Sequence, residues 1–86
     1  MTYLVVDQPA AERDLAKLPR DVLRRVDDRI RTLAENPRPP GSEKLKGAED
    51  LYRVRVGDYR ILYRIDDKAR VVRIARVRHR RDAYRG

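Results

Sequence analysis

The chain has 86 residues, no cysteine and a formal net charge of +8. Its length suits one small domain with a single core, and the lack of cysteine excludes disulfides, thiolate metal sites and cysteine nucleophiles. No stretch approaches the ~20 apolar residues of a membrane span and the N-terminus lacks a signal-peptide pattern, so we expect a soluble cytoplasmic protein without membrane contact.

The N-terminal half predicts a short strand followed by two helices. Residues 2–6 are β-rich and stop at Asp7, which with Pro9 predicts a helix cap and a first-turn proline. Pro19 disfavours helical geometry before it, so a second helix should begin there and end at residues 35–41. Apolar residues recur at helical spacing through both segments: Ala11, Leu15, Leu18, Val22, Val26, Ile30 and Leu33. The helices should form a hairpin with one apolar side.

After the proline-rich loop the hydrophobic period changes from 3.6 to 2. Three alternating segments predict strands: residues 51–56, 59–65 and 70–77. The turns fall at Gly57-Asp58 and at residues 66–69. Residues 1–86 therefore predict a single α+β domain of order β-α-α-β-β-β, with an antiparallel sheet and the helix pair packed on one face.

A two-residue first turn determines which side chains face each other across the first strand pair. One face is apolar and would meet the helices: Val56 with Tyr59, Val54 with Ile61, and Tyr52 with Tyr63. The other face places Arg55 opposite Arg60, with Arg53 beside them. Like charges facing each other across strands are destabilising. The arrangement indicates acidic partners from elsewhere in the chain, a bound anion, a different register, or simply a solvated face.

The third strand is less well determined. Pairing Ile65 with Arg70 would add Val72 and Ile74 to the apolar face, whereas a slip of one residue would reverse the faces. The same pairing adds Arg73 to the basic face, where we expect it to bind RNA.

The positive charge lies in the C-terminal part of the chain. Residues 1–50 carry ten Lys and Arg against ten Asp and Glu, whereas residues 51–86 carry twelve against four. This asymmetry indicates a polyanionic partner, although arginine richness can also serve solubility alone. The last strand runs into a cluster at the edge of the sheet, which the predicted register places beside Arg53, Arg55 and Arg60: His79, Arg80, Arg81 and Tyr84.

This terminal cluster contains no carboxylate pair and no metal-ligand set, but it suits RNA. Guanidinium groups bind phosphate oxygens, and Tyr84 can stack on a base. RNA cleavage by its own 2′-hydroxyl needs a proton acceptor, a proton donor and positive charge, with no metal or other cofactor. Histidine ordinarily titrates near neutrality, which makes His79 a candidate acid or base, although a lone histidine is often incidental.

Two motifs in combination resemble the RelE side of the RelE/ParE toxin superfamily of toxin–antitoxin systems. They are GDYRILY at residues 57–63 and HRRDAYR at residues 79–85, and the resemblance covers nearly the whole chain. It implies an mRNA interferase, an endoribonuclease that enters the ribosomal 30S A site and cuts the bound codon by 2′-hydroxyl attack, which inhibits translation. It also implies a cognate antitoxin, which would wrap the toxin in a hetero-oligomeric complex.

The resemblance implies roles for individual residues. Arg60 and Arg80 would stabilise transition-state charge, and Tyr84 would position the nucleophile and stack on a base. Arg53 and Arg55 would grip the RNA or transfer protons. Arg81 would bind RNA or the antitoxin.

Two features depart from the family pattern. Some members carry lysine where this chain has Arg53 and Arg55, and a guanidinium is a poor general base. His79 would then have to take the proton, unless electrostatics alone supply the rate. Arg78 stands where many relatives have glycine, and its bulk bears on how the C-terminal segment docks.

Two alternatives stay open beside the interferase. One is a ParE-like gyrase-inhibiting toxin, whose members generally lack the arginine and tyrosine cluster. The other is a non-catalytic basic relative that only grips RNA. Arg60, Arg80 and Tyr84 favour the interferase over the gyrase poison.

Overall fold

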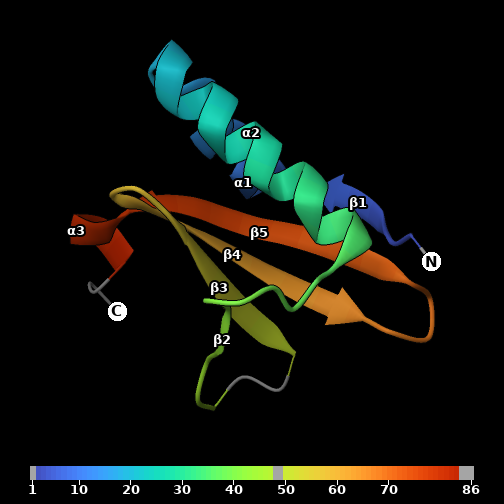
Figure 1. The fold of residues 1–86 in the computed structure, drawn as a ribbon. Helices are drawn as coiled ribbons and strands as arrows, with labels where there is room; N and C mark the ends of the chain where they lie inside the picture. The colour runs from blue at the N-terminus through green and yellow to red at the C-terminus, as the bar shows by residue number, and fades with distance from the viewer. Residues whose placement is uncertain (1, 48–49, 84–86) are drawn as a thin grey trace.

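The computed structural model describes residues 2–47 and 50–83 as one sheet covered by two helices. Its elements are β1 (Leu4–Asp7), α1 (Pro9–Ala16), α2 (Arg20–Glu35), β2 (Glu43–Lys44), β3 (Leu51–Val56), β4 (Tyr59–Asp66), β5 (Val71–His79) and α3 (Arg80–Ala83). The strand order is β1-β5-β4-β3-β2, and α1 and α2 lie on one face of the sheet (Figure 1). The predicted α+β fold is confirmed, with β2 and α3 as additions. No helix in the described ranges is long and apolar enough to cross a membrane.

The sheet is antiparallel except at one edge, where β1 pairs in parallel with β5. The predicted cap at Asp7 is wrong, because Asp7 still belongs to the strand and lies opposite Ile74. Gln8 occupies the cap position without a side-chain hydrogen bond, and its backbone N–H donates to the Ile74 carbonyl at 2.9 Å. Pro9 opens α1 and Pro19 precedes α2, as predicted.

The predicted register of the first hairpin is confirmed, with Arg55 opposite Arg60. The register across the second turn differs, because Ile65 lies opposite Val72 instead of Arg70. Arg70 instead ends a longer turn with a positive φ of 56°. A shift of two residues keeps the side chains before the bulge on their expected faces, so Val72 and Ile74 are buried as predicted.

The β4–β5 pair contains a bulge that the sequence analysis did not anticipate. The register shifts between Leu62, which lies opposite Arg76, and Tyr63, which lies opposite Ile74. The extra residue on β5 changes which side chains face the helices beyond that point. Val77 consequently enters the core.

The core lies between the helix pair and the sheet. Its buried apolar residues come from α1, α2 and the three long strands: Ala11, Val26, Ile30, Leu33, Val54, Ile61, Tyr63, Ile65, Val72, Ile74 and Val77. Leu15, Leu18 and Val22 pack against them, which confirms the predicted helical stripe. The buried Tyr63 donates its hydroxyl to the Pro37 carbonyl at 2.7 Å, so the core also holds the loop after α2.

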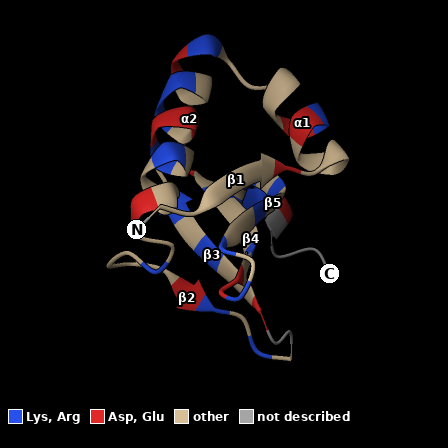
Figure 2. Ribbon diagram, turned by 90° about the vertical axis from the view of Figure 1, so that its right-hand side faces the viewer, with Lys and Arg blue, Asp and Glu red and all other residues tan. Residues whose placement is uncertain are grey.

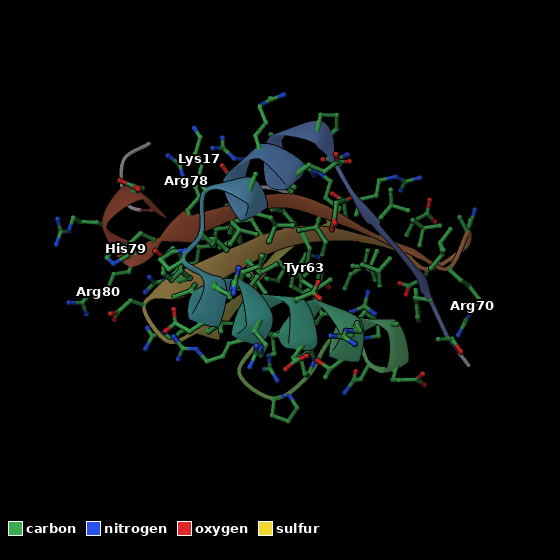
Figure 3. The ribbon with its side chains drawn as sticks, turned by 90° about the horizontal axis from the view of Figure 1, so that it is seen from above. Lys17, Tyr63, Arg70, Arg78, His79 and Arg80 are labelled. Atoms are coloured by element: carbon green, nitrogen blue, oxygen red, sulfur yellow. The ribbon has the colours of Figure 1, made fainter. Side chains whose placement is uncertain are left out.

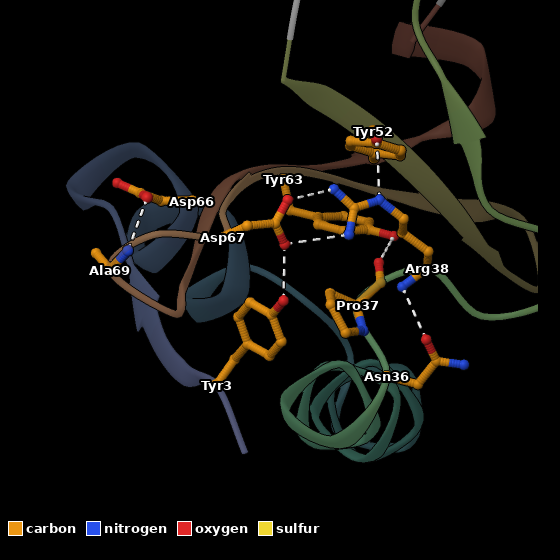
Figure 4. Close-up of polar contacts among 9 residues, drawn as sticks. All are labelled: Tyr3, Asn36, Pro37, Arg38, Tyr52, Tyr63, Asp66, Asp67 and Ala69. Atoms are coloured by element: carbon orange, nitrogen blue, oxygen red, sulfur yellow. Dashed lines mark hydrogen bonds and ion pairs between the residues drawn. The ribbon is translucent and has the colours of Figure 1, made fainter. Parts of the chain in front are cut away.

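A polar network joins four segments that are distant in the sequence (Figure 4). Arg38, in the loop after α2, donates two hydrogen bonds to Asp67 at 3.2 and 2.9 Å and one to the Tyr52 hydroxyl at 3.1 Å. Tyr3 donates its hydroxyl to Asp67 at 2.7 Å. The hydrogen bonds from Arg38 and then Tyr3 hold the pKa of Asp67 below its ordinary value. The network anchors the loop that leads into β2.

Asp14 of α1 covers the edge of β5 beyond the end of β1. Its Oδ2 accepts hydrogen bonds from the Arg76 Nε at 2.8 Å and the Val77 backbone N–H at 2.9 Å, and its Oδ1 accepts one from the Arg76 Nη2 at 3.1 Å. Burial acts to raise the pKa of this carboxyl, but the hydrogen bonds from Arg76 and Val77 outweigh it, and the pKa is lowered.

We expect Asp14→Asn to lower the free energy of unfolding by about 1–3 kcal/mol near neutral pH, because a charge-assisted hydrogen-bonded pair is lost. A lowered folded-state pKa gives stability that is present above the ordinary carboxyl range and lost as the pH falls through the folded value. Urea unfolding should therefore show that the free energies of unfolding of Asp14→Asn and the parent differ at about pH 7 and approach each other at about pH 3. Glu12→Gln on the same helix is the control, and equal stability of Asp14→Asn and the parent near neutrality would contradict the assignment.

Candidate nucleic-acid interface

The arginines of β3 and β4 gather on the sheet face turned away from the core. Arg53 and Arg55 alternate with core residues of β3, and Arg60 of β4 lies opposite Arg55. With the loop before β2 they line a pocket of about 330 Å³, which we call the basic pocket: Gly41, Glu43, Arg53, Arg55 and Arg60. Arg60 is only 4% exposed, so solvent screens its charge less than that of the exposed Arg55.

The basic pocket also contains a carboxylate that the sequence analysis missed. Glu43 belongs to the two-residue strand β2 and lies opposite Arg53, whose Nη2 donates to it at 2.7 Å. This hydrogen bond lowers the pKa of Glu43 most, and the charges of Arg55 and Arg60 lower it further. One ionised carboxylate facing three guanidiniums eases their repulsion and leaves the pocket positive. A strand of two residues is too short to show an alternating pattern in the sequence. The one indication of Glu43 was the expectation that an acidic side chain from elsewhere in the chain could face the paired arginines.

Arg80 lies at the same end of the sheet, beside the first hairpin turn. Its backbone N–H donates to the Asp58 carbonyl at 2.7 Å, and its Nε lies 3.9 Å from the Asp58 Oδ1. Asp58 belongs to the turn between the strands that carry Arg55 and Arg60, so Arg80 lies beside the turn that joins the two main strands of the basic pocket. Its side chain is exposed. Tyr84, the other terminal candidate, lies outside the described residues.

His79 does not line the basic pocket. It lies opposite Tyr59, whereas Arg60 lies opposite Arg78. Because side chains alternate along a strand, His79 shares the face of Tyr59, and the two rings meet edge-on with centroids 5.2 Å apart. Its Nδ1 accepts the backbone N–H of Arg81 at 3.2 Å. The expected grouping of His79 with the β3 arginines is therefore absent, and its role in proton transfer stays a prediction.

Arg78 has a more central position than its treatment as a family departure suggested. It lies opposite Arg60 in the β4–β5 pair. It also lines a separate hollow of about 240 Å³ beside α1, together with Lys17 and His79. Figure 3 shows Lys17, Arg78, His79 and Arg80 gathered at one end of the molecule. The pairing of Arg78 with Arg60 lies beyond the bulge, so no local pattern in the sequence could have found it.

The remaining predicted RNA-binding residues lie apart from the basic pocket. Arg73 lies opposite Arg64, and its Nη1 is 3.9 Å from the Asp66 Oδ2. Arg81 is exposed on α3. Among the residues that the structure describes, no group of three or more His, Cys, Asp and Glu side chains could hold a metal ion.

Comparison with known sequences finds toxins. A family model described as the ParE toxin of the type II toxin–antitoxin system parDE matches residues 6–84. Toxin RelG of Mycobacterium tuberculosis is 40% identical over 86 residues, which covers 99% of each chain. The putative toxin RelE1 of Methanocaldococcus jannaschii is 34% identical over 76 residues, covering 85% of this chain and 84% of the relative.

Solved structures show the same similarity in three dimensions. The toxin–antitoxin complex RelBE2 of Mycobacterium tuberculosis contains a chain with a TM-score of 0.82 and 36% identity, over 92% of this chain and 99% of that one. The archaeal RelE–RelB complex of Pyrococcus horikoshii gives a TM-score of 0.83 and 33% identity over the whole of both chains. The second similarity extends over the whole chain and therefore includes β2, which carries Glu43.

Proposed function

The chain belongs to the RelE/ParE family of toxins of type II toxin–antitoxin systems, and on that basis we propose that it is a ribosome-dependent mRNA endoribonuclease. The observation that carries the proposal is the basic pocket, in which Arg53, Arg55 and Arg60 meet Glu43. Three guanidiniums suit a phosphodiester, and an ionised carboxylate suits a proton acceptor. RNA cleavage by internal attack requires both functions.

In the proposed reaction the RNA 2′-hydroxyl attacks the adjacent phosphorus. Glu43 accepts the hydroxyl proton. Arg53 orients the Glu43 carboxylate through the 2.7 Å hydrogen bond that it donates. A 2′,3′-cyclic phosphate forms as the bond from phosphorus to the 5′-oxygen breaks, and the leaving oxygen takes a proton from solvent. Arg60, beside Arg55, stabilises the negative charge that develops on the phosphorane oxygens. Arg53 and Arg55 then need not act as general bases, a role for which a guanidinium is poorly suited.

We also propose that a cognate antitoxin binds this chain in a hetero-oligomeric complex. Two solved relatives over 30% identical are toxins in complex with their antitoxins, and their similarity extends over nearly the whole chain. The positive surface supports a partner that carries acidic side chains. The ribosome is the proposed target, where mRNA would be presented as an unpaired codon.

We expect the parent chain to cut mRNA within ribosome-bound codons, and Arg80→Ala and Tyr84→Phe to reduce that cleavage. Mapping of mRNA 5′ ends in a reconstituted translation system measures it. Arg80 lies beside the turn that joins the strands of the basic pocket, so loss of its charge should lower the rate by about 10²-fold or more. Arg64→Ala, which removes an exposed arginine paired with Asp50, is the matched control and should cut like the parent.

The same experiment separates the other functions considered. Growth arrest with intact mRNA and broken DNA would identify a gyrase-inhibiting toxin. Binding of RNA by the parent without any cleavage would identify a non-catalytic relative. Either outcome would contradict the proposed nuclease.

A further inference from the structure

We propose that a second phosphate-binding subsite lies between α2 and β3 and holds the RNA backbone where it leaves the basic pocket. This inference rests on the proposed function, because it concerns the same RNA strand. The site is a shallow hollow of about 390 Å³, which we call the α2–β3 hollow: Arg25, Asp28, Arg29, Thr32, Arg55 and Val56.

Two arginines of α2 reach the hollow from the helix side. Arg25 and Arg29 are four residues apart and so lie on one side of the helix. The Arg25 guanidinium extends to the first hairpin turn, where its Nη1 lies 3.4 Å from the position a Cβ on Gly57 would occupy. The carboxylate in the lining, that of Asp28, accepts a hydrogen bond from the Arg31 Nη2 at 2.9 Å. Asp28 is thus engaged by Arg31, and the hollow stays positive.

Arg29 presents a donor that requires an acceptor. Its Nε is buried and has no hydrogen-bond partner among the described residues. Buried polar groups are nearly always hydrogen-bonded, and a buried donor without an acceptor is unfavourable. The guanidiniums of Arg25 and Arg29 line the hollow, and a turn of the Arg29 side chain would bring its Nε–H to an oxygen of a phosphate bound there. Arginine suits this task because its planar fork matches the geometry of a phosphate.

Arg55 connects the hollow with the basic pocket, because its side chain lines both. In the part of the chain that the structure describes, β2 pairs only with Tyr52 and Arg53, so β3 has no strand partner on that side at Arg55. An RNA strand held in the basic pocket can therefore pass over Arg55 to Arg25 and Arg29. Figure 2 shows arginines, in blue, on both α2 and β3. Continuity with the basic pocket favours RNA over an acidic antitoxin segment.

The test is the salt dependence of binding to a single-stranded, fully 2′-O-methylated RNA of about 12 nucleotides, which cannot react by internal attack. Each phosphate contact of a single strand contributes about 0.7 to the slope of log K against log salt. We expect the double variant Arg25→Gln/Arg29→Gln to bind more weakly and to lose about 0.7 of that slope. Arg20→Gln/Arg24→Gln removes the same charge from α2 outside the hollow and should keep the parent slope.

Arg25→Gln alone keeps the half-buried Arg29, so it tests the site if the double variant does not fold. It should also weaken RNA binding and raise KM for ribosome-bound mRNA with kcat unchanged. If the parent binds RNA but the hollow variants keep its slope, the subsite is wrong and the proposed function stands. An equal loss of slope in the Arg20/Arg24 control would also contradict the subsite. So would a loss of antitoxin affinity with RNA binding unchanged. A parent that neither binds RNA nor cuts mRNA would overturn the proposed function itself.

Discussion

Replacement of Arg60 by alanine should lower the rate of mRNA cleavage by about 10²–10³-fold, with a smaller effect on RNA binding. Arg60 is 4% exposed and lies opposite Arg55 in the basic pocket. A charge withdrawn from water acts on developing negative charge more strongly than an exposed one, because less solvent screens it. Single-turnover cleavage of ribosome-bound mRNA, saturated with toxin, measures the chemical step.

Two further variants separate the role of Arg60 in the reaction from a role in folding. Arg60→Lys keeps the charge but loses the planar fork, so it should restore part of the rate. Arg64, on the same strand, is exposed, and its Nη1 lies 2.7 Å from the Asp50 Oδ1. Arg64→Ala should therefore cleave mRNA like the parent. Chemical unfolding of all three checks that they fold. Cleavage by Arg60→Ala at the parent rate, or an equal loss in Arg64→Ala, would contradict the assignment.

Glu43→Gln should lower the cleavage rate by about 10²–10⁴-fold, the usual contribution of a general base. The amide oxygen can still accept the hydrogen bond from Arg53, so the variant removes the base while keeping the local contact. RNA affinity should hold or increase, because a negative charge leaves the basic pocket. Glu35→Gln, which changes the last residue of α2, is the matched control.

The pH profile distinguishes Glu43 from His79 as the proton acceptor. The hydrogen bond from Arg53 and the nearby arginines hold the pKa of Glu43 below its ordinary value, so it stays ionised from about pH 5.5 upward. The parent rate should therefore not fall as the pH drops from about 8 to about 5.5. A histidine base would lose activity through about pH 6.5. An acidic limb there that disappears in His79→Asn would assign the proton to His79.

Local periodicity predicted the part of the fold that depends on neighbouring residues. The alternation in β3 and β4 and a two-residue turn were enough to place Arg53, Arg55 and Arg60 together, since a hairpin register follows from its own turn. The break at Pro19 and the apolar stripe of the helices depend equally on local geometry. The three arginines of the basic pocket were predicted for the same reason.

The features that the sequence did not predict depend on contacts between distant segments. The parallel pairing of β1 with β5 leaves no local signal, because the strand alone does not specify its partner. Nothing in the alternation marks the bulge at Leu62, which changes the side chains that reach the helix face. Glu43 was missed because its short strand is defined by Arg53 across the sheet. The wrong placement of His79 and the missed Glu43 thus have one physical origin.

The position of β1 also bears on when the molecule can fold during its own synthesis. β1 precedes the other strands of the sheet along the chain, and within the described residues it pairs only with β5, with Leu4 opposite Val71. The bonds between them close a loop that contains α1, α2 and the other strands, and such distant contacts form late because the ends must first meet. A growing chain therefore keeps β1 unpaired until β5 has emerged. A truncated product cannot complete the sheet, so incomplete synthesis should yield little functional toxin.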